Sequence, residues 1–189
     1  MFRRISTVVS IVLTVSVSDC TATDIVIPAG WVIPQDAVFN EQWRRDSVQK
    51  YLAVDGDFDG NGLADVAMIL QKKDGDGIGL FAFMGRSDGS YLAECLFDST
   101  QFLSAIGVPD EVKKSEQEIY RRYWGIRLVE TGGYPTACGK GYYECTADEP
   151  ETLVLRHQAI DFFFYDAGGN QFFFWKEESK KFVSVQMSD

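Results

Sequence analysis

The residues best suited to chemistry lie together in one acidic segment, residues 57–65, which reads DFDGNGLAD. Alternate positions in its first half carry side chains with oxygen atoms that can point toward one centre. Proteins bind Ca²⁺ through about six to eight oxygen atoms in a flexible arrangement. The expected ligands are the side chains of Asp57, Asp59, Asn61 and Asp65 and the backbone carbonyl of Leu63. The segment therefore predicts a site for a calcium cofactor.

The glycine-rich middle of this segment suits a sharp turn around an ion. Gly62 can adopt a positive φ without steric cost, and we expect the side chain of Leu63 to pack into the core. Carboxylates that converge without a cation repel one another, so the ion should order the loop when it binds. The alternative is an acidic turn that holds no ion, since Asp and Gly are also common in ordinary turns.

The strand-like flanks of the segment distinguish it from an EF-hand. An EF-hand loop that began at Asp55 would need Glu at its twelfth position, where this chain has Val66. The run VDGDFDGNGLADVA at 54–67 instead resembles the FG-GAP/VCBS class of β-propeller repeats, and GRSDGSY at 85–91 resembles a later turn of that repeat. The resemblance covers residues 51–97 and implies a blade-like hairpin that carries a calcium loop. A propeller needs several blades, so a single repeat does not imply the propeller fold.

The sequence offers little for catalysis. His157 is the only histidine, and its place at the end of a predicted strand favours a surface or capping role. No nucleophile elbow, HExxH motif or phosphate-binding glycine loop is present. A hydrolase that uses paired carboxylates stays open, because 28 acidic residues allow many pairs. We expect a protein that is not an enzyme.

The formal net charge of −10 constrains the partners. A chain this acidic repels phosphate backbones, and no cluster of Lys or Arg offsets the repulsion, so we expect no nucleic-acid binding. The acidity suits a divalent cation or a basic protein partner.

The first residues predict export. Arg3 and Arg4 precede an uncharged apolar stretch over 5–17 that is too short to span a bilayer comfortably. Residues 1–18 therefore resemble a signal peptide, which leaves residues 19–189 as a single exported globular domain in the periplasm. Lipidation of Cys20 is the alternative, and it would be the only route to the membrane.

Export permits disulfide bonds. The segment CGKGYYEC contains two glycines and can close a small ring, so we predict a bridge between Cys138 and Cys145. A zinc site would need more thiols or histidines nearby. Cys95 lies in an apolar run and is expected to be a buried thiol.

Hydrophobic runs separated by Asp-Gly and Gly-Gly turns indicate antiparallel β-meanders. Strands are predicted over 51–54, 66–70, 78–84 and 91–97, over 126–129, and in a second meander over 152–156, 160–165, 171–175 and 182–186. Helices are predicted over 37–50, 101–106 and 110–122. The aromatic runs at 162–165 and 172–175 would place rings on both faces of their strands, so both faces are expected to be covered. The predicted fold is mainly β (α+β), with one or two short helices.

Exported calcium-loop proteins of this size resemble periplasmic immunity proteins, which protect bacteria from wall-degrading toxins. The C-terminal pattern, from Cys138 to the final MSD, is similar to exported proteins of Gram-negative bacteria. The resemblance implies a periplasmic immunity or inhibitor protein that binds a basic wall hydrolase. The alternative is a structural or adhesive module of the envelope, in which calcium serves stability.

Overall fold

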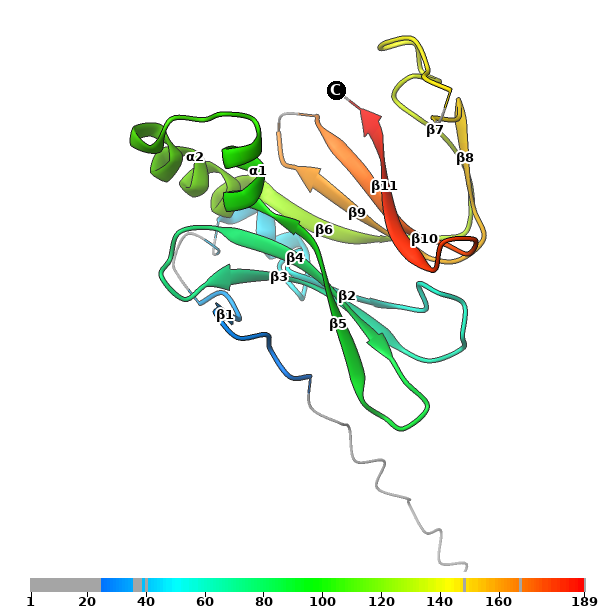
Figure 1. Ribbon diagram of the computed structural model, residues 1–189, viewed down its shortest axis with the longest axis horizontal. Coiled ribbons are helices and arrows are strands. Elements are labelled where there is room, and N and C mark those ends of the chain that lie inside the picture. The colour runs from blue at the N-terminus through cyan, green and yellow to red at the C-terminus, as the bar shows by residue number, and fades with distance from the viewer. Residues whose placement is uncertain (1–24, 36–38, 40, 148, 167, 189) are drawn as a thin grey trace, which may run out of the picture.

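The computed structural model describes residues 25–35, 39, 41–147, 149–166 and 168–188 (Figure 1). The predicted signal peptide, Cys20 and part of the predicted helix 37–50 lie outside these residues. Within the described part, no helix is long and apolar enough to cross a bilayer.

The first sheet contains the meander predicted around the acidic segment. Its strands are β1 (Trp31–Val32), β2 (Ala53–Gly56), β3 (Asp65–Lys72), β4 (Ile78–Gly85) and β5 (Tyr91–Asp98). They are antiparallel in the order β1-β3-β4-β5, and β2 also pairs with β3. The hairpin predictions are confirmed, because β3 pairs antiparallel with β4 and the Asp-Gly turn at 74–77 joins the two strands.

The second sheet has the order β11-β10-β9-β6. Its strands are β6 (Trp124–Val129), β9 (Ala159–Phe164), β10 (Asn170–Lys176) and β11 (Lys181–Ser188). The predicted second meander is confirmed for its last three strands but is wrong for its first. Residues 152–155 form β8 (Thr152–Leu155), which pairs with β7 (Gly132–Pro135), and β6 takes the place beside β9.

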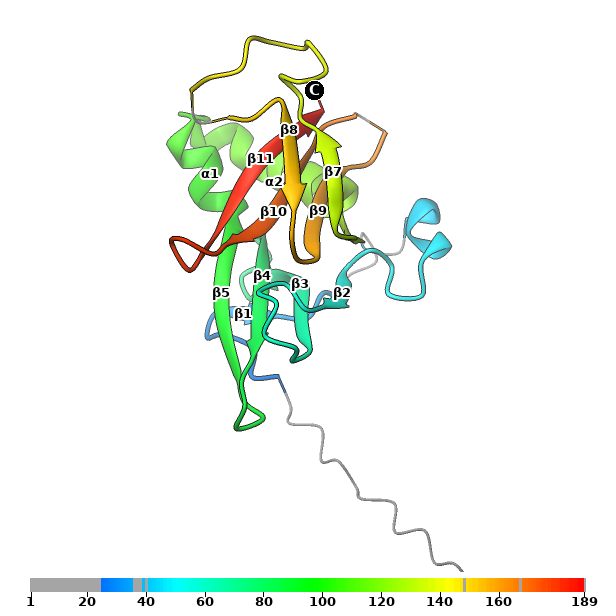
Figure 2. The same ribbon diagram turned by 90° about the vertical axis from the view of Figure 1, so that its right-hand side faces the viewer.

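The two larger sheets pack face to face around a common core. Ile69 and Leu80 of the first sheet and Ile160 and Phe162 of the second are all fully buried in it. The β7–β8 hairpin covers the opposite face of the second sheet, as Figure 2 shows from the side where β7 and β8 face the viewer.

Aromatic side chains cover both faces of β9 and β10, as the sequence predicted. Phe162 lies in the core between the sheets, whereas Phe163 on the other face packs edge-on against Trp43 and Tyr51. Phe172 lies on the same face as Phe163 and packs beneath the β7–β8 hairpin. The three-layer arrangement explains why these strands carry continuous aromatic runs.

The helices lie at one end of the sheets (Figure 1). α1 (Ser99–Ala105) and α2 (Asp110–Tyr123) agree with the predicted helices at 101–106 and 110–122. The predicted helix at 37–50 is wrong beyond residue 46, because Gln42–Asp46 form a 3-10 helix, η2, and the described residues after it form a turn. Lys50 and Tyr51 have positive φ angles of 53° and 56°, which no helix accommodates. Val48, within the predicted helix, is fully exposed.

One prediction about the cysteines is confirmed and the other is wrong. Cys138 and Cys145 form the predicted disulfide, with an S–S distance of 2.07 Å. Cys95 is a free and exposed thiol, so the prediction that it is buried is wrong. It lies on the outer face of β5, opposite Phe81 of β4, and β5 is the last strand at that edge of the sheet.

Candidate metal centre

The acidic segment forms the loop between β2 and β3. The two strands come together at its base, where Gly56 pairs with Asp65. Phe58 anchors the loop, because its fully buried ring lies in the core and meets Phe182 of the second sheet edge-on. The sequence had assigned this anchoring to Leu63, but the Leu63 side chain is only half-buried. The loop is thus fixed to the core near its start, and its acidic side chains lie around the anchor.

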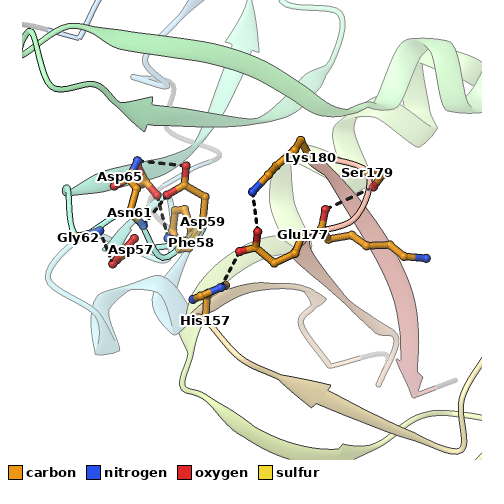
Figure 3. Close-up of polar contacts among 11 residues, drawn as sticks. Asp57, Phe58, Asp59, Asn61, Gly62, Asp65, His157, Glu177, Ser179 and Lys180 are labelled. Atoms are coloured by element: carbon orange, nitrogen blue, oxygen red, sulfur yellow. Dashed lines mark hydrogen bonds and ion pairs between the residues drawn. The ribbon is translucent and has the colours of Figure 1, made fainter.

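The predicted carboxylates come together in this loop (Figure 3). Asp57, Asp59 and Asp65 each present a carboxylate oxygen, and these oxygens all lie within 4.8 Å of one another. Asn61 is adjacent, since its side-chain amide donates to Asp59 Oδ2 at 3.1 Å. Asn61 Oδ1 accepts from the backbone N–H of Leu63 at 2.7 Å. The role of the Leu63 carbonyl as a ligand stays a prediction.

Backbone donors and glycine turns hold the loop in this shape. Asp57 Oδ2 accepts from Gly62 N at 3.0 Å, and Asp59 Oδ1 accepts from Asn61 N at 3.1 Å. Gly60 and Gly62 have φ angles of 72° and 79°, a region that glycine adopts without strain. The alternate acidic residues therefore turn inward together.

Asp65 connects the loop to the neighbouring hairpin. Its side chain is fully buried, and its two oxygens accept from Phe58 N at 2.8 Å and from Gly85 N, at the end of β4, at 2.7 Å. Burial raises the pKa of the Asp65 carboxyl above its ordinary value, and the charges of Asp59 and Asp57 raise it further. The two backbone hydrogen bonds act in the opposite direction.

The cluster fits a divalent cation. Asp57 Oδ1 is buried and has no hydrogen-bond partner among the described residues. An unpaired buried carboxylate oxygen is costly, and a cation held between the carboxylates would remove this cost together with their mutual repulsion. The donor atoms are all oxygens, which are the ligands that hard cations prefer. Asp57, Asp59 and Asp65 can therefore hold a metal ion.

Residues of the second sheet and its connections lie against the loop (Figure 3), and none of them was predicted from the sequence. The ring of His157 lies over Gly60, and His157 Nε2 lies 2.9 Å from Glu177 Oε1. Glu177 Oε2 accepts in turn from Lys180 Nζ at 2.6 Å. His157, expected on the surface or at a cap, is half-buried against the acidic loop.

A second contact from the same connection reaches Asp57. The side-chain oxygen of Gln158 accepts from Asp57 N at 3.0 Å, and the side-chain nitrogen of Gln158 donates to Glu130 at 3.0 Å. Only the folded topology brings residues 157–158 to this loop, so no local sequence signal could have identified them.

Comparison of the chain with known protein families, with curated proteins and with solved structures finds no match. The likeness of residues 51–97 to an FG-GAP/VCBS repeat therefore rests on the motif itself. The function has to be argued from the geometry of the site and from the charge of the chain.

Proposed function

We propose that the chain is an exported calcium-binding protein of the periplasm that acts by binding another protein and not by catalysis. The observation that carries the proposal is the convergence of Asp57, Asp59 and Asp65 around a buried carboxylate oxygen without a hydrogen-bond partner among the described residues. Calcium is the favoured ion because the loop supplies only oxygen donors on a flexible, glycine-containing backbone.

The proposed ion completes a link between two hairpins. Its ligands would be the Asp57, Asp59, Asn61 and Asp65 side chains with the Leu63 carbonyl. Since Asp65 already accepts from Gly85 at the end of β4, an ion bound to Asp65 joins the β2–β3 loop to the β4–β5 hairpin. Binding would therefore stabilise the first sheet at this end. The free energy gained would grow with calcium concentration, because the folded chain alone presents the site.

The proposed partner is a basic protein, in particular a wall-degrading toxin that an immunity or inhibitor protein would neutralise. The net charge of −10 supports this choice, since opposite charge accelerates association and favours cationic partners. A signal peptide over 1–18 would place the chain in the periplasm, where such toxins act. If Cys20 is lipidated instead, the same protein would be anchored to the membrane.

One observation favours a second candidate, a structural or adhesive module of the envelope. The buried position of Asp65 makes the ion a connection between two parts of the fold. In this second function calcium would serve stability alone. Stabilisation by calcium without binding to any wall hydrolase would fit this candidate.

Calorimetric titration of calcium into the chelator-treated mature protein tests the proposed site. We expect saturable binding near one ion per chain, lost in the double variant Asp57→Ala/Asp59→Ala. The matched control is Asp74→Ala/Asp76→Ala in the β3–β4 turn, where Asp74 Oδ1 accepts from Asp76 N at 3.0 Å. That turn also has two aspartates two positions apart, but they lie outside the cluster. The control should therefore keep full calcium binding. Absence of binding heat in the native chain would reduce the loop to an acidic turn.

A further inference from the structure

The disulfide closes residues 138–145 into a short ring, called here the disulfide ring, whose base is firmly held. The residues before the ring, Thr136 and Ala137, are fully buried. Ala137 N donates to Gln186 O of β11 at 2.9 Å, and Thr136 Oγ1 donates to Pro150 O at 2.8 Å. Within the ring, Lys140 Nζ donates to Met187 O at 2.6 Å. The base is therefore fastened both to β11 and to the segment that leads into β8.

Glycines allow the ring to pack closely and to turn sharply. A Cβ atom at Gly139 would overlap the backbone carbonyl of Glu151, so the ring approaches the segment before β8 more closely than any residue with a side chain allows. Gly141 has a φ of 84° and directs the chain outward. In both Figure 1 and Figure 2 the ring projects beyond the β7–β8 hairpin, at the end of the molecule away from the β2–β3 loop.

The outer part of the ring presents two adjacent aromatic side chains. Tyr142 and Tyr143 are 51% and 42% exposed, although their neighbours at the base are buried. The hydroxyl of Tyr143 donates to Glu149 Oε1 at 2.6 Å, which orients that side chain. Tyrosine gives a large contact area with little conformational entropy to lose, and it is frequent among the residues that dominate binding energies. A covalently closed loop also loses less entropy on binding than a free one.

The charged side chains around the disulfide ring are mainly acidic. Glu144 and Glu151 are exposed and Glu149 is half-buried, whereas Lys140 is engaged with the backbone of β11. A protruding surface with aromatic and acidic groups is complementary to a concave, basic surface.

We infer that the disulfide ring is the surface through which this chain contacts its basic protein partner, with Tyr142 and Tyr143 as the main contact residues. The inference rests on the proposed function, because that function supplies the class of partner. It adds that the contact surface is separate from the metal centre, so calcium binding and partner binding can be altered independently.

The experiment measures binding of the mature, calcium-loaded chain to a panel of immobilised basic wall hydrolases that includes glycosidases, amidases and peptidases. Cytochrome c serves as a basic protein without wall-degrading activity. Tyr142→Ser is compared with Ile106→Ser, a control at the C-terminal end of α1 whose side chain is 58% exposed. Cys138→Ser/Cys145→Ser tests the closure of the ring. Calcium titration and circular dichroism of every variant establish that it is folded.

We expect at least one hydrolase to bind, and Tyr142→Ser to weaken that binding about tenfold or more, with calcium binding unchanged. Ile106→Ser should bind normally, and opening the ring should weaken binding although the chain still folds. Hydrolase binding that is unaffected by Tyr142→Ser in a folded chain would overturn the assignment of the ring but leave the proposed function standing. Equal binding to cytochrome c, or no binding to any hydrolase, would overturn the partner class and the assignment together.

Discussion

The imidazole ring of His157 occupies the space that a Cβ atom at Gly60 would need. Gly60 belongs to the acidic loop, and His157 belongs to the connection between β8 and β9. Glu177 holds the ring through a 2.9 Å contact with Nε2. The candidate metal centre is thus supported from outside by a residue of the other half of the fold.

Replacement of Gly60 by Ala should therefore destabilise the protein more than replacement of Gly62. Both glycines have positive φ, so each change to Ala costs about 1–2 kcal/mol in backbone strain. A Cβ at Gly62 meets nothing within 4 Å, whereas one at Gly60 overlaps His157, which adds about 1–3 kcal/mol. Urea unfolding in excess calcium measures the difference. His157→Ala should relieve the added cost in Gly60→Ala but not the cost in Gly62→Ala; equal effects in both backgrounds would contradict the contact.

Replacement of Asp65 and replacement of Asp59 should have different effects on the free energy of unfolding when calcium is removed. Asp65→Ala deprives the backbone N–H groups of Phe58 and Gly85 of their acceptor, at about 1–3 kcal/mol for each buried donor left unpaired. Asp59 is partly exposed, so Asp59→Ala in chelator should leave stability nearly unchanged, since it also relieves repulsion. At a calcium concentration about 100 times the Kd, both variants should lack roughly 2.7 kcal/mol of stabilisation seen in the native chain.

Thermal and urea unfolding with and without chelator separate these effects. The role assigned to Asp65 fails if Asp65→Ala is as stable as the native chain in chelator. A large loss from Asp59→Ala in chelator would show that the loop depends on Asp59 even without an ion.

Local patterns were sufficient to predict the hairpins and the acidic cluster. The apolar run of β3 and the Asp-Gly turn after it depend on neighbours in sequence, and so do the inward-turned Asp57 and Asp59. The sequence could not predict which residues of the second sheet would support the loop, because His157 and Gln158 reach it only through the packing of the sheets. The prediction that Leu63 enters the core was wrong. The loop contains two large apolar residues, Phe58 and Leu63, and the sequence alone does not tell which of them is buried.

The prediction for residues 37–50 failed for a similar reason. Their apolar spacing suits a helix, and Trp43 is indeed buried. The chain instead turns at Lys50, where the backbone carbonyl accepts from Arg44 Nη1 at 3.2 Å. The same guanidinium donates to the backbone carbonyls of Arg121 and Trp124, and this long-range packing overrides helix propensity.

Asp98 should make the free energy of unfolding decrease as the pH falls into the acidic range. Burial raises the pKa of its carboxyl, but hydrogen bonds from Thr100, Lys72 and Gln101 outweigh burial and lower the pKa overall. Asp98 caps α1 through Thr100 N at 2.9 Å and pairs with Lys72 at 3.2 Å. An acid with a lowered folded pKa stabilises the fold above its unfolded pKa, near 4, and this stabilisation is lost as pH falls through the folded value.

Asn at position 98 keeps a capping oxygen but loses the charge that pairs with Lys72, so Asp98→Asn should cost about 0.5–1 kcal/mol at pH 7 and progressively less below about pH 4. Urea unfolding of both proteins between neutral and acidic pH, in chelator, measures the change. Glu178→Gln is the matched control, because Glu178 is exposed in the β10–β11 turn. Curves for Asp98→Asn and the native chain that stay parallel down to the lowest pH would contradict the assigned role.

Arg44 should be among the most sensitive positions in the fold. It is fully buried, and burial lowers the pKa of its guanidinium to about 10. Its Nη2 donates to Trp124 O at 2.6 Å and to Arg121 O at 3.0 Å, where the C-terminal carbonyls of α2 carry partial negative charge. A guanidinium thus joins η2, the turn at Lys50 and the end of α2.

Arg44→Met should lower the free energy of unfolding by about 3 kcal/mol or more, because it leaves buried carbonyls without donors. Arg44→Lys should rescue little, since an ammonium group lacks the planar fork that reaches several carbonyls at once. The neighbouring Arg45 is exposed, so Arg45→Met should stay within about 0.5 kcal/mol of the native chain. Urea unfolding followed by tryptophan fluorescence suits this test, since Trp43 and Trp124 both contact Arg44. A native-like midpoint for Arg44→Met would show that water or rearranged backbone can replace the guanidinium.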